Sequence, residues 1–209
     1  MRIRLTFSKT GPMQYIGHLD LHRSWERTFR RSGLPLAYSQ GFNPQPRLNL
    51  ACALPLGFTS QCEILDAWLE QDLPIAQIQE TVSNALPPGL VVHSVEMIDL
   101  QAPTLQTQVN SAIYVITFFD DIPDLKDRLQ RIISADHLPR IRRNKSYDLR
   151  SLIEEIALLP QNDSGNYEVR VQLAAREAAT GRPEELLDEL GIKFEATHVH
   201  REKLIFAGT

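Results

Sequence analysis

Two histidines lie four residues apart, so they would share one face of a helix. His18 and His22 can therefore be read as metal ligands or as a general acid and base. Trp25 and Phe29 continue the same face, which favours packing or a backbone hydrogen bond instead. We accordingly expect no bound metal, and keep the two histidines as catalytic candidates.

The two cysteines limit the possible cofactors. Cys52 and Cys62 are too few for a three-cysteine iron–sulfur motif, a four-cysteine zinc site or a disulfide framework. No phosphate-binding glycine loop, nucleophile elbow or HExxH motif occurs. The sequence therefore predicts no cofactor. A cytoplasmic location is the default expectation, and no apolar run is long enough to cross a membrane.

Charged residues are distributed unevenly along the 209 residues, although the net charge is only −4. Residues 1–60 carry eight Lys or Arg and two Asp or Glu. Residues 61–125 carry ten Asp or Glu and no Lys or Arg, and residues 126–150 return to eight basic and three acidic side chains. Such asymmetry is typical of a protein that meets a polyanion, or of one whose segments neutralise each other.

A basic stripe is predicted on the helix expected over residues 18–32. Arg23, Arg27 and Arg30 repeat at i, i+4 and i+7, opposite the apolar face, and can meet successive phosphates of one strand. In the alternative, the stripe pairs with the acidic residues of 61–125. The candidate nucleic-acid contacts are Arg23, Arg27, Arg30, Arg31, Tyr38, Phe42, Asn43, Arg47, Arg140, Arg142, Arg143 and Lys145.

The loop over residues 39–47 is the other site-like feature. Prolines and glycines interrupt regular structure there, while Ser, Gln and Asn offer hydrogen-bonding groups. Tyr38 and Phe42 can stack on bases, and Arg47 can hold a phosphate. The competing interpretation is a rigid surface turn whose aromatic rings cover the core.

The elements that would position these residues follow one order twice. Strands of period two and helices of period 3.6 predict βαββαβ over residues 1–100, a polar linker over 101–110, and βαββαβ again over 111–209. The predicted fold class is therefore α+β, with two tandem ferredoxin-like units and antiparallel sheets.

Five segments carry a family resemblance. The segments 15–20 (YIGHLD), 30–44 (RRSGLPLAYSQGFNP) and 54–57 (LPLG), with the later segments 147–150 (YDLR) and 181–184 (GRPE), resemble the radical-SAM-linked domain of unknown function. The resemblance implies a partnership with a cobalamin-binding radical-SAM protein, in a setting of ribosome or RNA maturation. It assigns no catalytic residue.

Three functions fit these observations. The first is an accessory module that binds RNA or a ribonucleoprotein such as a ribosomal particle, works with the radical-SAM protein, and has no catalysis of its own. The second is a metal-independent endoribonuclease of the tandem ferredoxin-like type, with His18 or His22 beside Arg30 and Arg31. The third is a protein-only adaptor that docks through its acidic block, residues 61–125.

Overall fold

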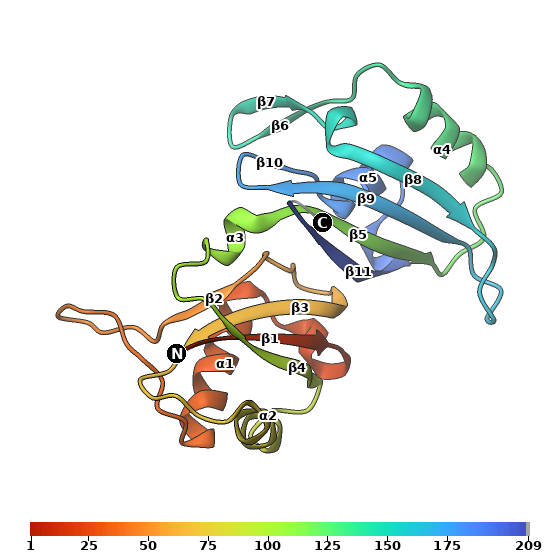
Figure 1. Cartoon of the computed structure of the whole chain (residues 1–209). Helices are drawn as coiled ribbons and strands as arrows, with labels where there is room; N and C mark the ends of the chain where they lie inside the picture. Colours follow the sequence, from red (N-terminus) through yellow and green to blue (C-terminus); the bar gives the residue numbers. More distant parts are fainter. Residues whose placement is uncertain (208–209) are drawn as a thin grey trace. The chain divides into compact units, whose positions relative to one another are not determined.

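The computed structural model describes residues 1–207 and is a mixed α+β structure (Figure 1). The predicted α+β class is confirmed. The chain divides into two compact units, Met1–Val109 and a second that starts at Asn110. None of the helices in the described part of the chain is long and apolar enough to cross a bilayer.

The first unit has four strands and two principal helices in the order β1, α1, β2, β3, α2, β4. Its strands are β1 (Arg2–Lys9), β2 (Leu48–Leu50), β3 (Thr59–Trp68) and β4 (Leu90–Ile98), and its helices are η1 (Gly11–Tyr15), α1 (His18–Ser32) and α2 (Ile75–Asn84). β1 pairs antiparallel with both β3 and β4, and β2 pairs antiparallel with β3. The strands therefore lie in the order β2-β3-β1-β4.

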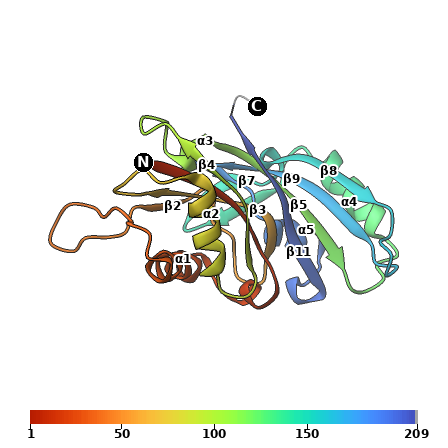
Figure 2. The same ribbon diagram turned by 60° about the horizontal axis from the view of Figure 1, so that its bottom comes forward.

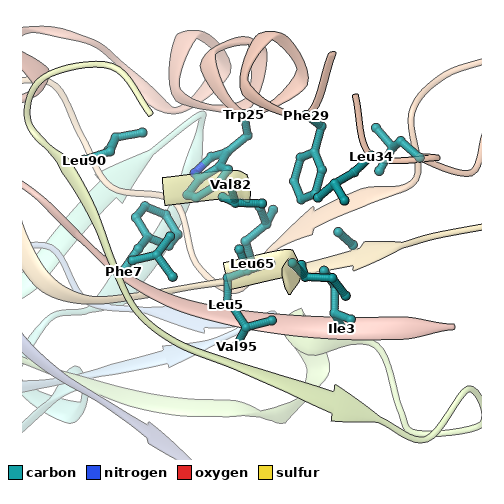
Figure 3. Close-up of a cluster of buried hydrophobic side chains, with 14 of the residues drawn as sticks. Ile3, Leu5, Phe7, Trp25, Phe29, Leu34, Leu65, Val82, Leu90 and Val95 are labelled. Carbon is teal, nitrogen blue, oxygen red and sulfur yellow. The ribbon is translucent and has the colours of Figure 1, made fainter. Parts of the chain in front are cut away.

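One hydrophobic core joins this sheet to both helices. Ile3, Leu5 and Phe7 alternate along β1 and are fully buried, as the period-two pattern predicts. Figure 3 shows Trp25 and Phe29 of α1 directed at the same cluster, and both side chains are fully buried, which confirms the expected apolar face. α1 is thereby held in one orientation on the sheet.

The second unit follows with β5, α4, β8, β9, α5 and β11, and adds a separate hairpin of β6 and β7. Its elements are β5 (Val109–Phe118), α4 (Leu125–Ser134), β6 (Pro139–Arg142), β7 (Lys145–Asp148), η2 (Arg150–Leu152), β8 (Ile153–Leu159), β9 (Glu168–Arg176), β10 (Ala179–Thr180), α5 (Pro183–Leu190), η3 (Phe194–Ala196) and β11 (Thr197–Phe206). β9 pairs antiparallel with β5, β8 and β10, and β11 lies next to β5.

The segment expected to be a linker, residues 101–110, has structure of its own. A short helix, α3 (Leu105–Gln108), lies within it, and Leu105 is fully buried. β5 begins directly after α3, so the boundary between the compact units falls at the start of a strand.

The two longer helices of the second unit, α4 and α5, pack through apolar residues at helical spacing. α5 stops at Gly191, whose φ of 70° is the left-handed conformation that glycine adopts most readily. Leu125, Leu129 and Ile132 of α4 are buried, but the adjacent apolar residue Ile133 is 40% exposed. A stripe three residues wide is enough for this short helix, so the fourth apolar side chain faces solvent.

Candidate nucleic-acid interface

α1 presents the predicted basic stripe on the side opposite its buried face. The helix ends at Gly33, whose φ of 69° allows the chain to turn away. Arg23, Arg27 and Arg30 are all exposed. Because the buried Trp25 fixes the rotation of α1, the side that carries these three arginines must face solvent.

The stripe is largely uncompensated. Arg23 pairs with Asp20 at 3.3 Å, but both side chains are more than half exposed, so the pair is weak. Within residues 1–207, no carboxylate lies at ion-pair distance from Arg27 or Arg30. The same part of the chain shows no ion pair from the stripe to an acidic residue of 61–125. The observation that α1 keeps free positive charge therefore favours an external anion.

Arg31, which follows the stripe in sequence, contacts the end of α2. Its Nη2 donates a 2.6 Å hydrogen bond to the carbonyl oxygen of Ala85, the residue that ends α2. A cation at the last carbonyls of a helix satisfies an acceptor and interacts favourably with the helix dipole. Arg31 is therefore better explained as a tie between the two helices of the first unit than as a phosphate contact.

The loop over residues 39–47 is closed at its base and open at its tip. The amide of Ser39 donates to the carbonyl oxygen of Gln45 at 2.8 Å, and the amide of Gln45 donates to Ser39 Oγ at 2.9 Å. The loop then extends away from the first unit (Figures 1 and 2). Phe42 is completely exposed, Tyr38 is 45% exposed, and Asn43 also faces solvent. These aromatic rings do not cover the core.

Arg47 stands where the loop enters β2. Its guanidinium lies 4.8 Å from the ring centre of Trp68, a cation–π contact that orients it. The residue remains exposed, so the arginine is positioned without losing access to a ligand.

The two catalytic candidates, His18 and His22, both lie in the first two turns of α1. His22 Nδ1 lies 3.1 Å from Glu26 Oε1, and its Nε2 lies 3.5 Å from the carbonyl oxygen of Leu48, the first residue of β2. His18 is half-buried in the first turn of α1. No group of three His, Cys, Asp or Glu side chains suited to a metal occurs among residues 1–207.

The candidate contacts in the second unit lie in the β6–β7 hairpin, and only some of them are free to contact a phosphate. Arg140 pairs with Glu189 of α5, and Arg142 pairs with Glu185 at 2.5 Å. Because these charges are compensated, neither belongs to an open phosphate-binding surface. Arg143 and Lys145, at the turn of the hairpin, are exposed. Of the four predicted phosphate contacts in this hairpin, Arg143 and Lys145 therefore remain.

Sequence reasoning missed a buried ionic cluster in the first unit. Asp66 of β3 accepts hydrogen bonds from Arg2 Nη2 at 2.6 Å and from Arg4 Nε at 2.8 Å. Asp66 is fully buried and Arg2 is 2% exposed. The alternation of Arg2 and Arg4 with apolar residues along β1 indicates that the two arginines share one face of the strand. Their partner Asp66 lies more than 60 residues away, so the sequence pattern does not identify it.

Glu184, in the first turn of α5, carries a pH-dependent stability contribution. Burial raises the pKa of this carboxyl, and outweighs the hydrogen bond from its own amide and the nearby Arg182. The folded state therefore holds the proton more tightly than the unfolded chain. The stability that this group contributes is complete below its ordinary pKa of 4.5 and is lost as the pH rises through the raised value.

Glu184→Gln is thus expected to melt at a higher temperature than the wild type at pH 7. The difference should shrink as the pH falls below the ordinary carboxyl range, because the wild-type side chain is then neutral as well. Thermal melts at both pH values measure it, with the exposed Glu195→Gln as the matched control. An equal gain at both pH values would show that the charge of Glu184 is not the cause.

The comparisons with known proteins identify a family. Residues 2–183 match the model of a family described as uncharacterized protein conserved in bacteria, DUF2344. Since the match covers most of the chain, the protein belongs to that family. A comparison with curated proteins finds no match.

Solved structures show a likeness in fold. A crystal structure of a Cbf5-Nop10-Gar1 complex matches with a TM-score of 0.50 and 10% identity, over 97% of this chain and 48% of the other. A structure of an archaeal box H/ACA sRNP Nop10-Cbf5 complex matches with a TM-score of 0.43 and 13% identity, over 95% and 46%. This chain thus spans about half the length of each of these matched chains. At 10% identity, the likeness to the Cbf5-Nop10-Gar1 structure concerns fold alone.

Proposed function

We propose that this protein is an RNA-binding module without catalysis of its own, and that it grips a single strand through the first unit. The observation that carries the proposal is the set of exposed, uncompensated cations on α1, held outward by the buried Trp25. Phosphate contacts supply most of the affinity of such surfaces. The exposed rings of Tyr38 and Phe42 add platforms on which unstacked bases lie.

The proposal extends to architecture and partner. The order β2-β3-β1-β4 in the first unit, and the related order of β8, β9, β5 and β11 in the second, support two ferredoxin-like units in tandem. The motifs in residues 15–57 are the support for a cobalamin-binding radical-SAM protein as the partner to which RNA or a ribosomal particle is presented. A cytoplasmic location remains a prediction from the cysteine content.

The endoribonuclease alternative is less well supported. A histidine that acts as a general acid or base needs a ring nitrogen that can reach the substrate. His22 has one ring nitrogen at Glu26 and the other near a backbone carbonyl. Arg31, which would stabilise the phosphate in that scheme, is bound to the end of α2. The protein-only adaptor would instead leave RNA unbound, so a binding measurement separates it from our proposal.

Changing Arg27 and Arg30 together to Gln is expected to weaken binding of an unstructured oligouridine. Each phosphate contact contributes about −0.7 to the slope of log affinity against log salt for single strands, so losing two flattens the slope by about 1.4. Filter binding across a salt series measures this. Glutamine retains the helix propensity of α1, so the fold should be unchanged.

The matched control is Lys126→Gln with Lys193→Gln, two exposed lysines of the second unit. It removes the same charge and should leave the slope near the wild-type value. Oligouridine binding with an unaltered salt slope in the arginine variant would remove α1 from the interface. Cleavage of the oligouridine would support the endoribonuclease instead, and no binding at all would support the adaptor.

A further inference from the structure

A cavity of about 630 Å³ opens in the second unit beside the β6–β7 hairpin. That volume is in the range of sites for small organic ligands. Its walls come from three separate stretches of the chain: the hairpin itself, the η2 turn, and residues 178–182. Two of the sequence motifs, residues 147–150 and 181–184, therefore meet here although they lie far apart in sequence.

The cavity is lined by positive charge that is not compensated. Arg143, Lys145 and Arg182 all line it and all face solvent. In the described part of the chain, no carboxylate is within ion-pair distance of these three side chains. Arg142 also lines the cavity but is paired with Glu185.

The single acidic residue of the lining is already engaged. Asp148 Oδ1 accepts hydrogen bonds from the amides of Leu138 at 2.8 Å and Arg150 at 3.0 Å. Its Oδ2 lies 3.0 Å from His137 Nδ1. Asp148 thus braces the base of the hairpin and adds little repulsion toward an anion.

The walls are tied to each other, so the cavity is largely formed before a ligand arrives. Arg142 Nη1 donates to the carbonyl oxygen of Thr180 at 3.1 Å, and its guanidinium lies 4.9 Å from the ring centre of Tyr147. Gly181, between the lining residues Thr180 and Arg182, packs so closely against β9 and η2 that an added Cβ would lie 3.2 Å from Leu173 Cβ and 3.3 Å from Leu152 Cβ. A larger side chain at residue 181 would therefore disturb this packing next to the cavity.

We infer that this cavity binds an organic phosphate. Three cations in one lining suit a phosphate group, and the hydroxyls of Ser146 and Ser151 add hydrogen-bonding groups to the lining. Leu152 and Ala179 give the lining an apolar part, and the volume far exceeds that of inorganic phosphate. The ligand therefore carries an organic body, as a nucleoside monophosphate does, either free or at the phosphorylated end of an RNA.

Calorimetric titration of the full chain with AMP, adenosine and inorganic phosphate tests the site directly. AMP is expected to bind saturably, adenosine not at all, and inorganic phosphate more weakly than AMP. Failure of AMP to bind, or equal binding of adenosine, would overturn the inference. These results do not depend on α1, because the Arg27→Gln, Arg30→Gln variant should bind AMP like the wild type.

Variants locate the binding. Lys145→Gln with Arg182→Gln should lower the affinity for AMP by about tenfold for each charge removed. Lys145→Arg with Arg182→Lys keeps both charges and should retain binding within a few-fold, which guards against a trivial loss of fold. An equal loss in the Lys126→Gln, Lys193→Gln control would overturn the assignment to this cavity.

Binding measurements with oligonucleotides distinguish a free nucleoside monophosphate from the phosphorylated end of an RNA. The comparison uses the Arg27→Gln, Arg30→Gln variant and a 5′-phosphorylated oligouridine. If this oligouridine binds more tightly than both AMP and the same oligouridine with a 5′-hydroxyl, the ligand is an RNA end. AMP binding more tightly than the phosphorylated oligouridine identifies a free mononucleotide. Either result supports an organic-phosphate site, whereas indifference to the phosphate in every arm contradicts it.

Discussion

Trp25→Ala is expected to lower the free energy of unfolding of the first unit by about 3–5 kcal/mol, the usual cost of emptying a buried aromatic site. The indole is fully buried, and its ring centre lies 4.8 Å from that of Phe7 in an edge-to-face arrangement. Phe29 contacts it from the next turn of α1, 6.1 Å away. The site is enclosed by both the helix and the sheet, so it cannot collapse easily.

Urea unfolding followed by tryptophan fluorescence measures this loss in the correct unit. The chain has two tryptophans, Trp25 and Trp68, and both belong to the first unit. Trp68 is therefore the remaining reporter in the variant. Phe42→Ala is the matched control, because that ring is completely exposed and its removal should change stability by less than about 0.5 kcal/mol. Equal effects of the two changes would contradict the role of Trp25 as the anchor of α1.

The same variant separates fold from function in the interface. Trp25→Ala should weaken RNA binding only where the first unit is partly unfolded, so stabilising conditions should restore it. Arg27→Gln with Arg30→Gln should weaken binding with an unchanged unfolding transition. The anchor and the contact surface lie on opposite sides of one helix, and this division is what makes the two experiments independent.

α1 could be predicted almost entirely from the sequence. Its apolar and basic residues each repeat at helical spacing, and Gly33 followed by Pro35 marks its end. The same kind of local signal marks the end of α5, which Gly191 terminates. Where neighbouring residues decide the structure, period and capping are sufficient.

The parts that could not be predicted depend on distant partners. The β6–β7 hairpin has few apolar residues, and two of its arginines, Arg140 and Arg142, are balanced by carboxylates of α5 more than 40 residues later. A run of positive charge in the sequence therefore suggested an open patch that the fold partly neutralises. The cavity beside the hairpin was invisible for the same reason, because its walls are brought together by tertiary contacts.

Asp66→Ala is expected to destabilise the first unit by about 3–5 kcal/mol, because removing one partner of a buried ion pair leaves uncompensated charge behind. Arg2 is affected most, since it is nearly inaccessible and its Nε and Nη2 both donate to Asp66 Oδ2. Arg4 loses its partner at the same time, at 2.8 Å from Asp66 Oδ1. Arg2 and Arg4, two residues apart on the same face of β1, would then repel each other.

Fluorescence-detected urea unfolding again reports the loss, with Asp20→Ala as the control. Asp20 also pairs with an arginine, but on the exposed side of α1, so its removal should cost at most about 1 kcal/mol. A loss as small as this in Asp66→Ala would show that water reaches the buried cluster and replaces the carboxylate.

Replacing the whole cluster should be far less harmful than breaking it. The triple change Arg2→Met, Arg4→Met, Asp66→Leu removes all three charges together, and such apolar replacements are often neutral or stabilising. Arg2 also donates to the carbonyl oxygens of Ala102 at 2.6 Å and Pro103 at 2.9 Å. Because residue 103 is exposed, water can take over part of that role. We therefore expect the triple variant to regain most of the stability that Asp66→Ala loses, and a triple variant no more stable than the single one would show that the cluster stabilises the fold outright.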